Sequence, residues 1–150
     1  MVAQLKDFAT SVVAVVEPET PALVVAQVMR KHHIGALVVV DAQEKSRPIG
    51  IVTDRDLVLE LMAEELDPAV FTAGDIMTVD LVLARPDMST MEAVELMKTH
   101  RLRRLVIAND EGQLAGIVTM EDVLEQLTRE LADLAQGLAG ARDREVSERS

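Results

Sequence analysis

Two short stretches of the sequence place an aspartate three residues after a threonine, directly behind an apolar run. They are GIVTDRDL at 50–57 and GIVTMEDV at 116–123, so the pairs are Thr53 with Asp56 and Thr119 with Asp122. A carboxylate can accept hydrogen bonds from both vicinal hydroxyls of a sugar, as the acid of dinucleotide-binding folds does for ribose. The same spacing suits a helix start, where threonine accepts a backbone N–H and the acid complements the dipole. The pattern alone therefore allows a ligand site or a helix cap.

Other chemistry finds no support in the residue types. The chain has no cysteine, and of its three histidines His32 and His33 are adjacent, without the i, i+4 spacing of a helical metal site. No nucleophile elbow, HExxH sequence or P-loop occurs. We therefore expect no catalytic residues, no metal and no enzyme activity.

The two stretches belong to a repeat that covers most of the chain. Thr119 follows Thr53 by 66 residues, whereas Pro86 follows Pro18 by 68. The difference falls in the polar turn AQEKSR at 42–47, which makes the first hairpin longer than the second. An insertion in a turn between otherwise matched copies indicates a duplicated unit.

Each copy predicts the elements that would position its threonine and aspartate. Short apolar strands at 12–16 and 79–83 precede helices opened by Thr20–Pro21 and by Ser89 with Glu92. Two strands joined by a polar turn follow, at 36–40 and 48–52 in the first copy and 104–108 and 114–118 in the second. A second helix then begins at the motif threonine. The predicted fold is α/β (α+β), with tandem β-α-β-β-α repeats packed sheet to sheet about a pseudo-twofold axis.

The predicted limits are residues 1–67 for the first repeat, 68–75 for a linker and 76–136 for the second repeat. Residues 137–150 are charged and are expected to be a disordered tail behind Gly137 and Gly140. The leucines of the last helix form either a dimer contact or a lid on the protein's own core, and the sequence leaves both open. They are Leu124, Leu127, Leu131, Leu134 and Leu138.

Composition narrows the class of function. Hydrophobic residues make up 49% and charged residues 27% of the 150, which is typical of a folded chain with a core. The net charge of −11 and the near absence of aromatic residues disfavour nucleic-acid binding. No apolar run is long enough to span a membrane, and the N-terminus lacks the features of a signal peptide, so a cytoplasmic location is expected.

The duplicated unit, with a glycine, two aliphatic residues, the threonine and the aspartate at its last strand-to-helix junction, resembles the CBS domain. The pair resembles a Bateman module, the regulatory unit named after cystathionine β-synthase. DIMT at 75–78 and HRLRRLVIANDEGQLAGIVTMEDVL from residue 100 also fit, and the resemblance covers about residues 5–135. It implies two clefts that bind adenosine derivatives such as AMP, ADP, ATP, S-adenosylmethionine or dinucleotides.

The resemblance also implies roles for particular residues. The motif aspartate would hold the ribose hydroxyls, the threonine would support sugar or phosphate, and strand aliphatics would sandwich the adenine. One cleft would comprise Thr119, Asp122, Arg103, Arg104, Thr10, Ala14 and Ile34, and the other Thr53, Asp56, Arg55, Thr78, Val82 and Leu102. Solvated arginines and plain core packing are the alternatives for these positions.

The first of these clefts is the preferred nucleotide site. Arg103 and Arg104 could bind phosphate, whereas their counterparts Gly35 and Ala36 carry no charge. Glu121 would oppose a phosphate if it pointed inward.

The expected function is a stand-alone regulatory or sensor module that binds an adenosine-type ligand and signals through a change of shape or association. A homodimer and an effector protein of unknown identity are the expected partners. The alternative is a ligand-free protein–protein interaction module in which both motifs only cap helices.

Overall fold

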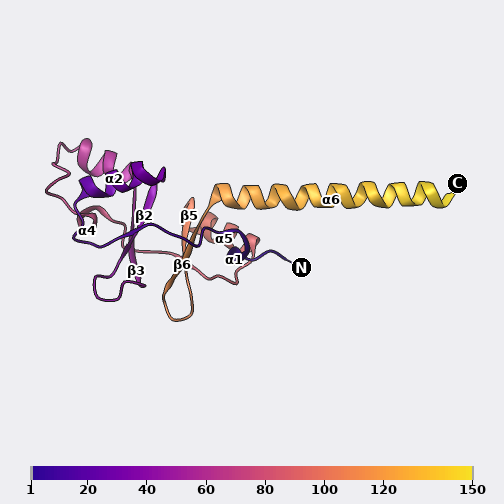
Figure 1. The fold of residues 1–150 in the computed structure, drawn as a ribbon, viewed down its shortest axis with the longest axis horizontal. Coiled ribbons are helices and arrows are strands. Elements are labelled where there is room, and N and C mark those ends of the chain that lie inside the picture. The colour runs from indigo at the N-terminus through magenta and orange to yellow at the C-terminus, as the bar shows by residue number, and fades with distance from the viewer. Residues whose placement is uncertain (1, 150) are drawn as a thin grey trace.

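The first repeat is a three-stranded sheet with helices on one face. The computed structural model describes residues 2–149 (Figure 1). A short helix α1 (Leu5–Phe8) precedes the repeat. The elements of the repeat are β1 (Val15–Val16), α2 (Ala22–His32), β2 (Ala36–Val40), β3 (Pro48–Thr53), α3 (Asp54–Asp56) and the π-helix η1 (Leu57–Met62).

The second repeat has the same order of elements and the same strand pairing. It is preceded by α4 (Ala73–Ile76), as the first repeat is by α1, and consists of β4 (Leu83–Ala84), α5 (Thr90–His100), β5 (Arg104–Ala108), β6 (Leu114–Thr119) and α6 (Met120–Arg149). In both sheets the first two strands are parallel and the last two antiparallel, and each hairpin carries a register shift near its turn. The predicted duplication and the mixed α+β class are confirmed.

Three aliphatic clusters hold the fold together. One lies inside each repeat, between its sheet and its helices. The third joins the two sheets through the buried side chains of Val38, Val40 and Val106. Branched apolar residues on facing strands remove both sheets from water at once, which a repeat of this size could not do alone. The repeats therefore pack sheet to sheet, as predicted.

The N-terminal segment of each repeat packs on the other repeat. The Leu5 side chain is buried in the second repeat's core, and Thr10 and Ile117 exchange backbone hydrogen bonds of 3.1 and 3.0 Å. Conversely, Ala73 is buried in the first repeat's core, and Thr78 exchanges bonds of 2.9 and 3.1 Å with Ile51. The predicted linker 68–75 thus ends in the packed helix α4. The exchange of N-terminal segments also brings residues 10–14 beside β6.

Helix α6 corrects the expectation of a disordered tail. It continues without a break to Arg149, through both Gly137 and Gly140. Each glycine lowers helix stability by about 1 kcal/mol relative to alanine, but the surrounding Ala, Leu, Arg and Glu favour the helix. An ion pair of 2.9 Å between Arg144 and Glu148, one turn apart, adds to this. The expectation is therefore wrong for residues 137–149.

No helix among residues 2–149 is both long and apolar enough to cross a bilayer. Within the same residues, no group of three or more histidine, aspartate or glutamate side chains could hold a metal ion.

Candidate nucleotide site

Both motif pairs form a reciprocal helix cap. The Thr119 N–H donates to Oδ2 of Asp122 at 3.0 Å, and the Asp122 N–H donates to the Thr119 hydroxyl oxygen at 3.1 Å. Thr53 and Asp56 make the same two bonds at 2.8 and 3.2 Å. The cap occupies Oδ2 only, and Oδ1 of Asp122 has no hydrogen bond within residues 2–149. Capping and ligand binding are therefore compatible in one carboxylate.

A cavity of about 240 Å³ opens beside Thr119 and Asp122. It brings together six of the seven residues predicted for this cleft: Thr10, Ala14, Ile34, Arg104, Thr119 and Asp122. Apolar side chains from both repeats make its walls, while the threonines, the aspartate and the arginine supply its polar groups. Five further lining residues were not predicted: Val12, Val13, Gly35, Ala36 and Ile117.

The glycine of the second motif lets the N-terminal segment reach this cavity. A Cβ on Gly116 would lie 2.7 Å from the carbonyl oxygen of Thr10, too close for any other residue. This approach allows the bridge between Thr10 and Ile117, which holds the segment along β6. The first residue of the motif therefore positions a wall of the cleft.

The structure separates Arg103 from the cleft for which it was predicted. Its guanidinium donates to Oε1 of Glu121 at 2.7 Å, and both side chains are exposed. The backbone N–H of Glu121 and then the Arg103 guanidinium lower the pKa of the Glu121 carboxyl, so this residue is ionised at neutral pH. Neither residue lines the cavity, and the Arg103 guanidinium is bound to Glu121 instead of facing the cleft.

Arg104 is the cationic residue that lines the cavity. It is the first residue of β5, pairs with Thr119 of β6 and is half-buried. A Cβ built on Gly35 would lie 3.5 Å from its Nη2 atom, so the side chain extends across to the start of β2 in the first repeat. Arg104 forms no salt bridge within residues 2–149, although its charge helps to lower the pKa of the Glu121 carboxyl.

The second predicted cleft is nearly closed. Its cavity measures about 50 Å³ and brings together Thr78, Val82 and Leu102, but not Thr53, Asp56 or Arg55. Arg55 is exposed.

The equivalent positions of the two repeats explain the difference in size. Val82 stands where the first repeat has Ala14, and Arg104 stands where it has Ala36. The larger side chains of Val82 and Arg104 fill the second cleft. Asp80 also lines this cleft, whereas the equivalent residue that lines the Asp122 cleft is the uncharged Val12. The Arg104 side chain therefore closes one cleft while supplying a charge to the other.

Comparison with known proteins agrees with this architecture. The sequence profile of the CBS domain matches residues 5–63 and 73–129. A CBS domain-containing protein of Bacillus subtilis, YhcV, is 36% identical over 132 residues, covering 87% of this chain and 91% of its own. An uncharacterised protein of Methanopyrus kandleri is 44% identical over 108 residues, which are 72% of this chain and 54% of the relative. The chain belongs to the CBS domain family and carries two CBS domains.

Solved structures share the fold. A CBS domain protein from Pyrobaculum aerophilum, complexed with AMP, is 22% identical with a TM-score of 0.75, covering 85% of this chain and 99% of its own. The CBS domain pair of protein MJ0100, in complex with 5′-methylthioadenosine and S-adenosyl-L-methionine, is also 22% identical, with a TM-score of 0.76 and coverage of 87% and 99%. At this identity the likeness concerns the arrangement of the repeats.

Proposed function

We propose that the Asp122 cleft binds an adenosine-containing ligand and that the protein is a regulatory module responding to it. The observation that carries this proposal is the convergence of Oδ1 of Asp122 and the Arg104 guanidinium at one apolar cavity, neither of them hydrogen-bonded or in a salt bridge within residues 2–149. Ligand sites commonly combine apolar walls with a few convergent polar groups. The adenosine ligands of the two structures of this fold add support by analogy.

Each lining residue has a role that its chemistry suits. Ile34 and Ile117 would pack on the two sides of the adenine ring. Asp122 would accept hydrogen bonds from the ribose hydroxyls through Oδ1, next to the Thr119 hydroxyl. Arg104 would bind the phosphate, because a guanidinium offers several donors to phosphate oxygens.

The cavity favours a small anionic ligand such as AMP within this class. Its volume of about 240 Å³ is below the roughly 300–1,000 Å³ of typical ligand sites, which suits one nucleoside better than a dinucleotide. The positive charge of Arg104 favours a phosphate and disfavours the sulfonium of S-adenosylmethionine. The single positive charge of Arg104 can largely neutralise the one phosphate of AMP, but not the three phosphates of ATP.

Ligand binding would act on the arrangement of the repeats. Ile34 belongs to the first repeat and Asp122 to the second, so one bound molecule contacts both. A ligand that fits one arrangement better than another shifts the population toward it. The change would then pass to a partner chain or an effector protein.

Calorimetric titration with AMP, ATP and S-adenosylmethionine tests the proposal. We expect saturable heat with AMP, weaker binding of ATP and the weakest binding of S-adenosylmethionine. Absence of heat and of any thermal stabilisation with all three would contradict it. That result would favour the ligand-free interaction module, in which the Thr53 and Thr119 pairs act only as caps.

A further inference from the structure

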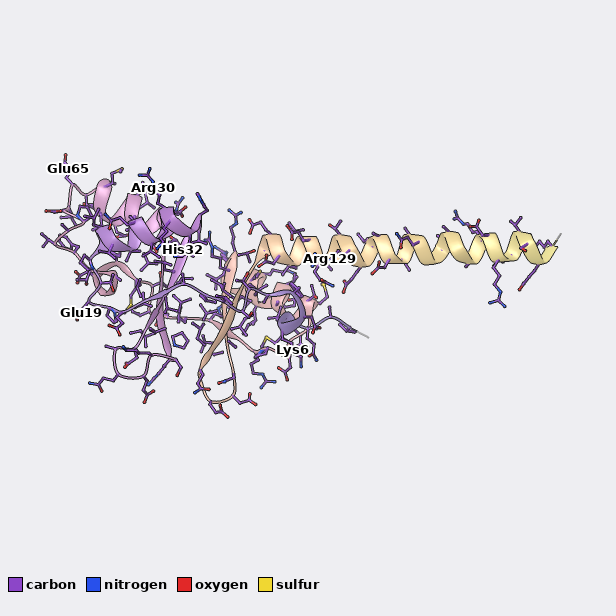
Figure 2. All side chains as sticks on the ribbon, in the orientation of Figure 1. Lys6, Glu19, Arg30, His32, Glu65 and Arg129 are labelled. Atoms are coloured by element: carbon purple, nitrogen blue, oxygen red, sulfur yellow. The ribbon has the colours of Figure 1, made fainter. Side chains whose placement is uncertain are left out.

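Helix α6 exposes a row of leucines far from the protein's core. Leu127 packs against the core of the second repeat, but Leu131, Leu134 and Leu138 are 67%, 70% and 52% exposed. The helix leaves the body and continues into open space (Figure 1), with Arg129 near the point of departure (Figure 2). A helix alone in water gains little stability, and an exposed apolar row indicates a contact surface.

The spacing of the row is that of a coiled-coil seam. From Leu127 to Leu131, Leu134, Leu138 and Ala141 the steps are four, three, four and three residues. Such a seam faces a second helix, whose identity and direction depend on the charged residues beside it. On α6 these are Glu130, directly before Leu131, and Arg142, Arg144 and Arg149, after Leu138. Arg142 would lie beside the uncharged Thr128 in an antiparallel pair and beside Gly137 in a parallel pair, so it does not decide the direction.

The charges fit a second copy of α6 that runs in the opposite direction. In an antiparallel pair, Leu134 faces Leu138 of the second copy and Leu131 faces its Ala141. This register places Glu130 beside Arg144 of the second copy, and by symmetry the same ion pair forms twice. Opposite charges beside a seam set partner choice and orientation.

A parallel pair of the same helices would be unfavourable. Each leucine would then face its own counterpart, and Arg144 would lie beside Arg149 of the second copy, a repulsion that also occurs twice. Glu130 would face Ala135 and gain nothing. The sequence of α6 is therefore self-complementary in one direction only.

We propose that α6 pairs with α6 of a second copy as a short antiparallel coiled coil through Leu131, Leu134, Leu138 and Ala141. Glu130 of each copy lies beside Arg144 of the other. The Arg144–Glu148 pair within the helix is exposed, so its weak interaction can be shared or replaced. The two CBS bodies then lie at opposite ends of the coiled coil, and the seam contains none of the residues that line the Asp122 cleft.

Single-cysteine cross-linking tests the pairing directly, because the chain has no cysteine of its own. In the antiparallel register Ala135 lies beside Ala135 of the second copy, whereas Gln136 faces outward on each helix. We expect a short bis-maleimide to join Ala135→Cys into a covalent dimer and to leave Gln136→Cys monomeric. Failure of Ala135→Cys to cross-link, or equal cross-linking of both variants, would overturn the proposal. Efficient disulfide formation by Leu138→Cys would indicate a parallel pair and would also overturn it.

Charge exchange tests the register by sedimentation velocity. Arg144→Glu should raise the dissociation constant of the dimer roughly ten-fold, because it places like charges together twice. The double variant Glu130→Arg/Arg144→Glu should restore association. Leu134→Asp should abolish the dimer, whereas Val146→Asp is a matched control, since Val146 is 68% exposed but lies off the seam. Stronger association of Arg144→Glu, or equal effects of Leu134→Asp and Val146→Asp, would contradict the proposal.

Discussion

Asp122 combines two roles that its sequence motif left as alternatives. One carboxylate oxygen completes a helix cap with Thr119, and the other is free to accept hydrogen bonds at the cavity. Thr72 and Asp75 form an equal cap, with bonds of 2.8 and 3.3 Å, although they lie outside both motifs. The cap is thus a general feature of this spacing, and its position on a cavity is what distinguishes Asp122.

Asp122→Asn should weaken AMP binding while leaving the fold intact. The amide oxygen can still accept the Thr119 N–H, but the charged acceptor for the ribose is lost, at a cost of about 1.5–3 kcal/mol. That corresponds to a rise in dissociation constant of roughly 10- to 150-fold, measured by calorimetry. Asp56→Asn is the matched control and should leave AMP affinity unchanged. A large fall in melting temperature for Asp122→Asn, with unchanged affinity, would reduce Asp122 to a cap.

Glu121→Gln should strengthen the binding of phosphate-bearing ligands. The substitution releases Arg103 from its 2.7 Å ion pair and removes the negative charge of the residue next to Asp122. Since both side chains are exposed, we expect a gain of only a few-fold in AMP affinity, screened by salt. Adenosine, which has no phosphate, should bind the variant and the natural protein equally. An equal gain for adenosine would show that the effect does not involve charge.

At the scale of elements, the repeat, the hairpins and the helix caps of Thr53, Ser89 and Thr119 follow from local patterns in the sequence. The cap expected from Thr20 is absent, because α2 has Pro21 at its N-cap and no side-chain hydrogen bond there. The unequal clefts do not follow from local patterns, because their size depends on where the long side chain of Arg104 lies after folding. In the sequence, the contrast between Gly35–Ala36 and Arg103–Arg104 predicts only a difference in charge. Side-chain bulk at the same positions decides which cleft is open. Gly137 and Gly140 predict an early end to α6, whereas their helix-forming neighbours continue the helix to Arg149.

Gly116→Ala should destabilise the protein by roughly 1–3 kcal/mol, because its Cβ would press on the Thr10 carbonyl. Chemical denaturation followed by circular dichroism measures this loss. Gly140→Ala is a useful comparison, since nothing lies within 4 Å of the added Cβ and the helix should gain stability. Equal effects of the two substitutions would contradict the close approach of the N-terminal segment.

Arg104→Ala should weaken phosphate binding in the Asp122 cleft and enlarge the second cleft. Removal of the side chain takes the cation from the Asp122 cleft and opens space in the cleft lined by Val82 and Leu102. AMP affinity should fall roughly ten-fold or more, as for loss of a charged hydrogen-bond partner. Adenosine should lose much less, and competition between the two ligands measured by calorimetry separates these outcomes. An unchanged affinity for AMP would exclude Arg104 as the phosphate group's partner.

At the scale of the whole molecule, two features matter most for function: the exchange of N-terminal segments between the repeats, and the long helix α6. The exchange of N-terminal segments ties the repeats together and builds a cleft whose walls come from both. Helix α6 extends from the second repeat, directly after Asp122, with a surface suited to a second copy. A ligand at the first residues of this helix and a second copy along its length would therefore contact one continuous helix.

Methyl NMR with isoleucine labelling tests the central claim most directly. The chain has six isoleucines and only two aromatic residues, so the ring current of a bound adenine would dominate the shifts of nearby methyl groups. On titration with AMP we expect the signals of Ile34 and Ile117 to move and saturate together, while Ile51, which lines the closed cleft, stays in place. Movement of Ile51 with Ile34 and Ile117 unchanged, or no movement of any isoleucine signal, would contradict the assignment of the Asp122 cleft as the nucleotide site.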